Sequence, residues 1–242
     1  MHHDAMNVTV VIPVYNEEEN VLPLARELAA IAPAFQSFEV ILVDDGSRDA
    51  TPDRIREAMT VCPGLRGLRM TRNSGQSAAM LRGLADARNE IVVPLDGDLQ
   101  NDPADIPALA AKVGEFDAVC GYRAKRKDTW SRRCGSRLAN RIRNSVTHDG
   151  MRDTGCSLKA FRRECVADLP HLDGVHRFMP AYFRLNHRTI CEVPVNHRAR
   201  VHGVSKYTNL KRLPRTIRDL MGFAWVRSRH IGADRKSATP VG

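Results

Sequence analysis

The stretch VTVVIPVYNEEEN, residues 8–20, decides the fold class. Its first seven residues, Val8–Val14, form a short and mostly β-branched run, which is typical of a strand buried on both faces of a sheet. The polar residues after it predict a helix with Asn16 as its cap, acidic residues in its first turn and an end near Ile31. A strand that passes directly into a helix is one unit of an α/β domain.

The same strand–helix pattern recurs along the first hundred residues. It predicts strands over 38–43, 65–70 and 91–95, and helices over 52–60 and 76–87, with Ser47 or Asp49 capping the first of these helices. Repeated units of this kind build a mostly parallel central sheet with helices on both faces. Beyond Asp105 we expect a helix over 106–113, a strand over 118–121, and irregular chain with short strands, such as 189–195, over 151–200.

Polar residues follow three of the four predicted strands at the point where each strand ends. They are Tyr15, Asn16 and Glu17 after the first strand, Asp44 and Asp45 after the second, and Asp96 and Asp98 after the fourth. Parallel sheets bind ligands outside the carboxyl ends of their strands. The sequence therefore predicts that these side chains converge on one crevice.

The residue types at these strand ends favour a divalent metal and a nucleotide. Asp96 and Asp98 are two apart and can share a Mg²⁺ or Mn²⁺ ion, while Gln100 at the same parity adds a neutral oxygen. Asp44 or Asp45 can accept hydrogen bonds from a base or a ribose hydroxyl. Capping of a helix by Asp45 or Ser47 is the alternative, and both roles can hold at once.

Composition describes a globular and basic chain. It has 242 residues, 43% of them hydrophobic, and a formal net charge of +9. The charge is concentrated: nine Lys/Arg and one Asp lie between Arg123 and Arg143, and nine more with one Asp lie between His197 and His230. An anionic partner is therefore expected. The six cysteines form no C-x-x-C pair and are expected to be reduced.

The ordered motifs resemble the inverting glycosyltransferases of family 2. The matching segments are VIPVYNEE (11–18), VDDGS (43–47), DGDLQNDP (96–103), RDTGC (152–156) with Lys159 and Arg162, RFMP (177–180) and HGVSKY (202–207). Within that family the chain is similar to the polyprenyl-phosphate branch, which includes dolichol-phosphate mannose synthase. The resemblance covers roughly residues 8–210 and implies the nucleotide-diphospho-sugar transferase fold called GT-A.

The resemblance also implies roles for individual residues. The nucleotide pocket would be lined by Pro13, Tyr15 and Glu17, with Asp44 or Asp45 and Asp96 beside them. The metal on the donor diphosphate would be held by Asp96, Asp98 and Gln100, and the donor phosphates would be reached by Lys206 with Arg198 or Arg200. The acceptor phosphate would be bound by Arg123 and Arg137, and Asp153 would lie near the transfer site. Catalysis is assigned to Asp98 and Asp153. For Asp153 a structural pair with Arg152 or Lys159 is the alternative.

The implied reaction transfers a sugar from a UDP- or GDP-sugar to a polyprenyl phosphate with Mg²⁺ or Mn²⁺. No apolar run approaches the roughly 18 residues of a membrane span and no secretory signal is visible, so we expect a cytoplasmic protein that lies peripherally on the membrane. We divide the chain into a GT-A domain over 1–210, a basic amphipathic helix over 211–230 and a disordered tail over 231–242. Phe223 and Trp225 would sit at the headgroup boundary of an anionic membrane. The alternative is an ordinary helix packed on the domain.

Three other functions fit the sequence less well. A family relative with a sugar or soluble acceptor would not need the basic stretch after Arg123. A nucleic-acid-binding module is disfavoured, because aromatic residues make up only 5% of the chain and no helix-turn-helix, RRM or zinc spacing occurs. An inactive scaffold would not need the Asp96/Asp98 pair. A membrane protein remains a further candidate partner.

Overall fold

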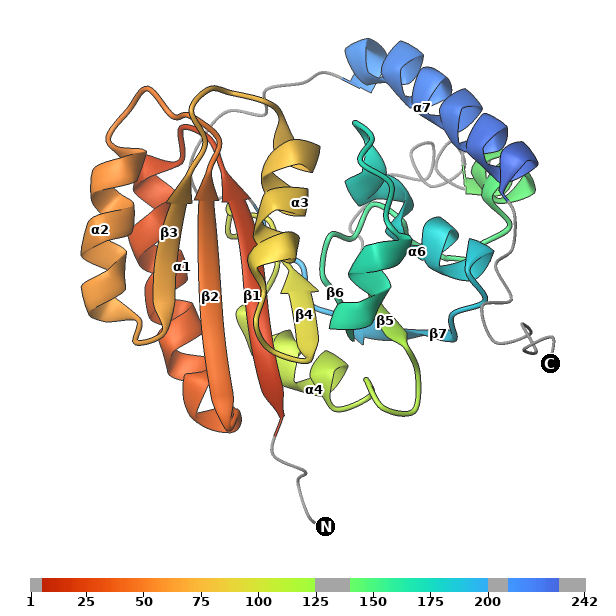
Figure 1. Ribbon diagram of the computed structural model, residues 1–242. Helices are drawn as coiled ribbons and strands as arrows, with labels where there is room; N and C mark the ends of the chain where they lie inside the picture. The colour runs from red at the N-terminus through yellow and green to blue at the C-terminus, as the bar shows by residue number, and fades with distance from the viewer. Residues whose placement is uncertain (1–5, 125–139, 200–208, 231–242) are drawn as a thin grey trace, which may run out of the picture.

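The computed structural model describes residues 6–124, 140–199 and 209–230. These residues build a seven-stranded sheet in the order β3-β2-β1-β4-β6-β5-β7 (Figure 1). The strands are β1 (Asn7–Val14), β2 (Ser37–Asp44), β3 (Leu65–Arg69), β4 (Ile91–Pro94), β5 (Ala118–Arg123), β6 (Lys159–Arg162) and β7 (Ile190–Val195). β6 is antiparallel to both of its neighbours, whereas the other pairings are parallel.

Helices cover both faces of this sheet. They are α1 (Glu18–Ile31), α2 (Thr51–Val61), α3 (Gln76–Asp86), α4 (Ile106–Ala110), a helix over 140–147, α6 (Val175–Leu185) and α7 (Asn209–Arg229), with short 3-10 helices η1 (Ala32–Ala34), η2 (Pro103–Asp105) and η3 (Arg163–Asp168). The α/β class and the mostly parallel sheet are as the sequence predicts. None of the helices in the described ranges combines the length with the apolar character that a bilayer crossing requires.

Two hydrophobic cores follow from the alternation of side chains along the strands. Along β1, Val10 and Ile12 enter the core shared with α1, α2 and α4, whereas Val11 enters the core shared with α3 and α6. α3 lies so close to the sheet that a Cβ on Gly83 would come within 2.4 Å of Val11 Cγ1. The continuous apolar runs of β1 and β2 are therefore explained by burial on both faces.

Three local features differ from the prediction made from the sequence. Residues 151–200 are not mainly irregular, because α6 spans eleven of them. Val175, Phe178, Met179, Tyr182 and Phe183 recur at helical spacing along it, so the apolar stripe of a helix is present in the sequence, although Pro180 within it disfavours a helix. Asn16 does not cap α1: its φ of 51° is left-handed and its Oδ1 accepts the Arg48 N–H at 2.9 Å, while Glu17 occupies the cap position. The helix expected over 106–113 ends at Ala110.

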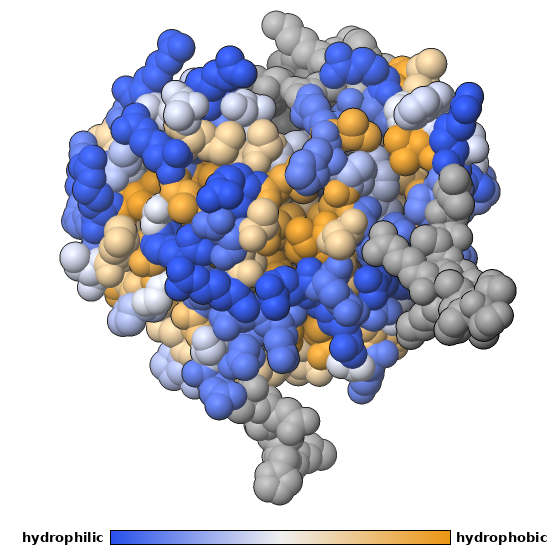
Figure 2. Space-filling model, viewed as in Figure 1, coloured by the Kyte–Doolittle hydropathy of each residue, from blue (hydrophilic) through white to orange (hydrophobic). Residues whose placement is uncertain are grey.

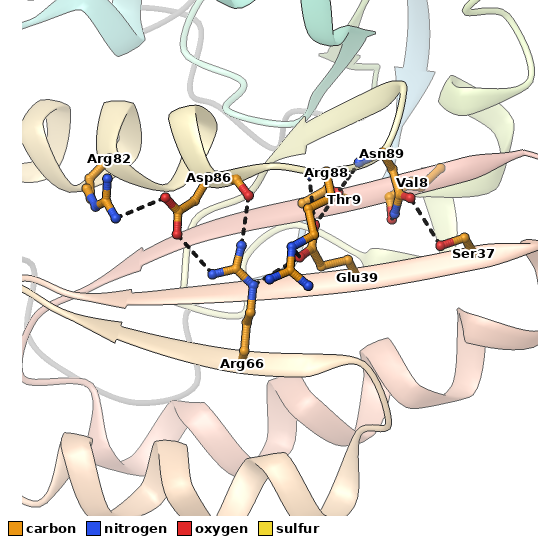
Figure 3. A network of polar contacts seen from close by, with 9 residues as sticks. All are labelled: Val8, Thr9, Ser37, Glu39, Arg66, Arg82, Asp86, Arg88 and Asn89. Carbon is orange, nitrogen blue, oxygen red and sulfur yellow. Dashed lines mark hydrogen bonds and ion pairs between the residues drawn. The ribbon is translucent and has the colours of Figure 1, made fainter.

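A polar network on the α3 side of the sheet ties β1, β2 and β3 to the end of α3 (Figure 3). Glu39 on β2 accepts hydrogen bonds from Thr9 Oγ1 at 2.7 Å and from Arg66 Nε at 3.0 Å. Arg66 also donates to the Asp86 carboxylate at 3.1 Å, and the Arg88 N–H donates to Glu39 at 3.1 Å. Burial raises the pKa of the Glu39 carboxyl, but these bonds outweigh burial and the net pKa lies below its ordinary value.

This network predicts a pH-dependent contribution to stability. Glu39→Gln should lower the free energy of unfolding by about 1 to 3 kcal/mol at pH 7, because Gln cannot pair with Arg66 as a carboxylate does. A folded pKa below the unfolded value stabilises the protein above the unfolded pKa of about 4.3, and this stabilisation is lost as the pH falls below it. Urea unfolding of both proteins at pH 7 and pH 4 should show a smaller difference at pH 4. An equal difference at both pH values would contradict the prediction.

Candidate active site

The carboxyl ends of β1, β2 and β4 lie side by side, as the sequence predicts. In the strand register Val14 pairs with Asp44, and Val11 pairs with Pro94. Two residues further along, Asp96 is level with Pro13. Gly97 confirms how close these segments are, since a Cβ there would lie 2.8 Å from Val14 Cγ1 and clash. The Asp96-Gly97-Asp98 turn therefore packs directly on the end of β1.

The loops after β1 and β2 are joined by hydrogen bonds. The N–H groups of Asn16 and Glu17 donate to Ser47 Oγ and Thr51 Oγ1, both at 2.9 Å. Ala50 in turn donates its N–H to a Glu18 carboxylate oxygen at 2.8 Å. These loops form one rigid rim of the crevice.

The three residues assigned to a nucleotide pocket from the first motif lie on this rim. Pro13 is buried within β1, while Tyr15 and Glu17 are half-buried at its end. The Glu17 carboxylate also accepts a hydrogen bond from Asn20 Nδ2 at 2.6 Å. Tyr15 and Glu17 thus keep part of their surface accessible at the end of β1.

The adjacent carboxylates Asp44 and Asp45 are both buried, and each has a structural task that the sequence did not reveal. Asp44 accepts the Ser47 N–H at 2.8 Å and pairs with Arg69 Nε at 3.2 Å. Asp45 accepts the N–H groups of Ser74 and Gly75, both at 2.8 Å, at the residues that lead into α3. Neither carboxylate caps α2.

Asp96 and Asp98 are half-buried and follow the end of β4. Gln76, the first residue of α3, donates from Nε2 to Asp96 Oδ1 at 2.9 Å. Asp98 Oδ1 accepts the Gln100 N–H at 3.2 Å, which shapes the turn that follows. The two carboxylates are thereby held at fixed positions two residues apart.

The electrostatics of this pair fit a cation. Burial raises the pKa of the Asp96 carboxyl, and the negative charge of Asp98 raises it further, against opposing effects of Ser157, Lys159 and Gln76. A divalent ion would relieve the repulsion. Within the described residues no group of three or more His, Cys, Asp or Glu side chains could hold a metal. Two neighbouring carboxylates are the kind of ligand that a hard divalent ion prefers, and such an ion would take its other ligands from a diphosphate and water.

Ser157 links this carboxylate pair to a second polar centre. It lies close enough to Asp96 to lower the pKa of that carboxyl, and its Oγ accepts a hydrogen bond from Asn101 Nδ2 at 2.7 Å. Four residues earlier, Asp153 forms a two-point ion pair with Arg123 at the end of β5, with Nε–Oδ2 at 2.7 Å and Nη2–Oδ1 at 2.8 Å. Both side chains of the pair are largely buried.

Asp153 pairs with Arg123 and not with Arg152 or Lys159, the two partners that the sequence suggested. Arg152 instead pairs with Glu192, and Lys159 donates to the Cys156 carbonyl at 2.5 Å. The close approach depends on Gly155, because a Cβ there would lie 2.7 Å from Arg123 Nη2. The two-residue RD motif thus uses its Arg and its Asp for separate ion pairs.

The basic residues expected at the donor and acceptor phosphates are only partly described. Arg137, Arg200 and Lys206 lie outside the described residues. Arg198 does not reach the crevice with a free guanidinium, since it pairs with Glu27 at 2.7 Å and Asp102 at 2.7 Å. Its role in the described chain is to fasten the segment after Asp98 to α1.

Gln76 and Ser157 are site residues that the sequence did not single out. Gln76 follows a predicted turn and begins a predicted helix, so its position was known but not its contact with Asp96. Ser157 lies just beyond the RDTGC motif. Only the meeting of α3, β4 and the 153–157 segment brings them together.

Comparison with known proteins identifies the family. The model of the family described as "Glycosyl transferase family 2" matches residues 9–169. Over 224 residues (90% of this chain) the sequence is 38% identical to a dodecaprenyl-phosphate galacturonate synthase of Rhizobium johnstonii. Over 208 residues (84% of this chain) it is 38% identical to an undecaprenyl-phosphate 4-deoxy-4-formamido-L-arabinose transferase of an Enterobacter species. The chain spans 66% and 63% of the length of these two relatives.

Solved structures share the fold. Glucosyl-3-phosphoglycerate synthase of Mycobacterium tuberculosis, in complex with Mn²⁺, UDP-glucose and phosphoglyceric acid, is similar with a TM-score of 0.70 and 20% identity over 94% of this chain and 82% of its own. The same enzyme with Mg²⁺ and UDP gives a TM-score of 0.67 at 19% identity, over 94% of this chain and 81% of its own. The GT-A fold expected from the motifs is confirmed.

The ion pair at Gly155 gives a testable consequence. Gly155→Ala should displace the Arg123 guanidinium from Asp153 and lower the free energy of unfolding by about 1 to 3 kcal/mol. Gly222→Ala on α7 is the control, because no atom lies within 4 Å of its added Cβ and Ala favours a helix. Denaturant unfolding with NMR of the arginine Nε–H signals would measure both. An unchanged Arg123 signal in Gly155→Ala would refute the assignment.

Proposed function

We propose, from the premise that this chain belongs to glycosyl transferase family 2, that it transfers a sugar from a nucleotide-diphosphate sugar to a polyprenyl phosphate with inversion at the sugar. The observation that carries the proposal is a pair of carboxylates suited to a cation, Asp96 and Asp98, with Ser157 close to Asp96 and only four residues along the chain from Asp153, which pairs with a buried arginine suited to a phosphate, Arg123. The two named relatives with polyprenyl-phosphate substrates support the choice of acceptor.

The donor would lie across the carboxyl ends of β1, β2 and β4. Tyr15 and Glu17 form the rim on which base and ribose would rest, with the buried Pro13, Asp44 and Asp45 beneath. The buried, bonded state of both aspartates favours a supporting role: they hold the backbone that faces the nucleotide. UDP and GDP donors both fit this description.

A Mg²⁺ or Mn²⁺ ion would be held by Asp96, Asp98 and Gln100. When bound, such an ion neutralises the departing diphosphate and orients it as a Lewis acid. The chain's own contribution is to keep both carboxylates in place through Gln76 and the backbone of Gln100. By their place in the motif, Arg200 and Lys206 would contact the donor phosphates.

The reaction needs alignment more than proton transfer. An acceptor phosphate oxygen forms a bond to the anomeric carbon while the bond from that carbon to the diphosphate oxygen breaks, and the nucleoside diphosphate leaves with the electron pair. Phosphate is already an anion, so it needs no strong general base. Positioning and electrostatic stabilisation would therefore supply most of the rate enhancement.

Arg123 and Asp153 suit recognition of the acceptor phosphate. The planar guanidinium binds carboxylate and phosphate through the same two-point geometry, so a phosphate would compete with Asp153 for Arg123. Asp153 would then orient the incoming group near the transfer site. Arg137 belongs to this acceptor site by sequence alone.

A lipid acceptor places the reaction at a membrane. We assign the protein to the cytoplasmic face, in peripheral contact with an anionic surface, since the chain is basic and the proposed acceptor is a membrane lipid. A membrane protein that docks this chain is a further candidate partner, and nucleic acid is not.

A donor screen tests this function. Purified protein with Mg²⁺ or Mn²⁺, a short-chain polyprenyl phosphate and a panel of UDP- and GDP-sugars should release nucleoside diphosphate with one donor. Asp98→Ala should lower the rate at least ~100-fold, because the ion that stabilises the leaving diphosphate loses a ligand. Chelation of the metal should have the same effect.

The control is Asp53→Asn, which removes an exposed carboxylate on α2 and should leave the rate unchanged. Release that requires a sugar or another soluble acceptor in place of the lipid phosphate would favour the soluble-acceptor alternative. A protein that binds no donor would be an inactive scaffold.

Substitution of the buried arginine separates acceptor from donor binding. Arg123→Lys should raise the KM for polyprenyl phosphate about tenfold, because an ammonium cannot make the two parallel hydrogen bonds of a guanidinium. The KM for the nucleotide-sugar should stay unchanged. Steady-state kinetics with each substrate varied in turn would measure both, and an equal rise in the two KM values would count against the acceptor assignment.

A further inference from the structure

α7 is held on the protein by one side only. Its Phe223 is 1% exposed, stacked on Phe178 of α6 with ring centroids 5.7 Å apart and edge-on to Tyr182 at 5.1 Å. The expectation that Phe223 sits at a headgroup boundary is therefore wrong, because the side chain is part of the core.

Polar contacts fix the rotation of α7 about its own axis. Asp219 pairs with Arg177 of α6 at 2.8 Å and lies so close to Gly174 that a Cβ there would be 2.9 Å from Asp219 Oδ2. Closer to the C-terminal end of α7, Arg227 donates to the Val146 carbonyl of the helix over 140–147 at 2.8 Å. These contacts determine which residues of α7 face outward.

The outward side of α7 carries a ridge of large hydrophobic residues. Ile217, Met221 and Trp225 recur every four residues and are 49%, 68% and 65% exposed. At a rise of about 1.5 Å per residue the ridge is about 12 Å long. Within the described ranges only six large hydrophobic side chains are exposed, and a fourth, Ile142, lies on the neighbouring helix over 140–147. Such a concentration marks an interaction surface.

The charges around this ridge are of one sign. Over the 209–229 span of α7 the sequence has six Lys/Arg and a single acid, Asp219, whose side chain is turned inward toward Arg177. Arg218 beside the ridge has a side chain that is 73% exposed. The helix over 140–147 likewise follows a basic stretch of sequence that begins at Arg123. The partner must therefore be apolar and anionic.

The place of α7 in the fold connects this surface to the site. Figure 1 shows α7 above α6, on the side toward which the arrows of β1, β2 and β3 point, which is the edge that carries Asp96 and Asp98. In the same view Figure 2 shows hydrophobic residues at the surface over α7 among hydrophilic ones.

We propose that the ridge Ile217–Met221–Trp225 inserts into the interfacial layer of an anionic lipid bilayer and turns the carboxyl edge of the sheet toward that bilayer. This inference rests on the proposed function only for the reason why the chain would meet a membrane. The exposure and the charge of α7 are independent of that function. An indole suits the boundary between headgroups and acyl chains, aliphatic side chains enter the acyl region, and arginines bind anionic headgroups. A second copy of this chain is a poorer partner, because two basic surfaces would face each other.

Flotation of the full chain with lipid vesicles tests the proposal. The wild type should float with vesicles that contain phosphatidylglycerol and much less with pure phosphatidylcholine. The triple variant Ile217→Ser, Met221→Ser, Trp225→Ser should bind the anionic vesicles at least about tenfold more weakly. The matched control Met59→Ser, Leu172→Ser removes two hydrophobic residues of similar exposure elsewhere and should bind as the wild type does.

Fluorescence gives a second, independent readout. The chain has two tryptophans, so Trp130→Phe leaves Trp225 as the reporter. Its emission should shift to shorter wavelength when phosphatidylglycerol vesicles are added. No shift, or flotation that is unaffected by the triple variant, would overturn the proposal. A wild type that dimerises through the ridge, with the triple variant monomeric by light scattering and neither protein bound to vesicles, would also overturn it.

The test stays separate from that of the proposed function. Binding to vesicles without any sugar transfer would leave the ridge assignment standing while the proposed function fails. Transfer to a detergent-dispersed short-chain polyprenyl phosphate should be unchanged in the triple variant, because the ridge lies outside the carboxylate and arginine sites.

Discussion

The carboxylate of Asp45 connects the two halves of the crevice. By accepting the N–H groups of Ser74 and Gly75, it fastens the end of β2 to the start of α3. That contact places Gln76 on Asp96, and it places the next residue, Ser77, on α6. A buried carboxylate is costly unless its oxygens are bonded, so this residue and the loop it holds depend on each other.

From Ser77 the connection continues to the helices that cover this face of the sheet. Its hydroxyl accepts the Gly174 N–H at 2.8 Å and lies 2.8 Å from His176 Nδ1, so the start of α6 is fixed against α3. The adjoining Arg177 then holds α7 through Asp219. The carboxylates of Asp96 and Asp98, the α6 helix and the outward ridge of α7 are thus connected through hydrogen bonds and packing contacts. Each can be altered separately, because each contact uses different side chains.

Arg123 and Asp153, the proposed acceptor site, stabilise each other before any ligand is bound. A buried guanidinium without a partner would be strongly unfavourable, and Asp153 supplies the partner with the geometry that a phosphate would otherwise provide. An acceptor phosphate that binds Arg123 as proposed would have to displace this carboxylate. Gly155 makes the pair possible, because any larger residue would occupy the space of the guanidinium.

The sequence alone determined the α/β class, the order of the first four strands and helices, the convergence of acidic strand ends, and the family. These follow from local signals: buried strands read as β-branched runs, and parallel strands end at one edge. Only the tertiary structure decided that Asp153 pairs with Arg123, that Gln76 and Ser157 flank Asp96, and that Phe223 faces inward while Met221 and Trp225 face out. Each of these depends on segments far apart in the chain, and helical periodicity alone cannot say which side of a two-sided apolar helix meets the core.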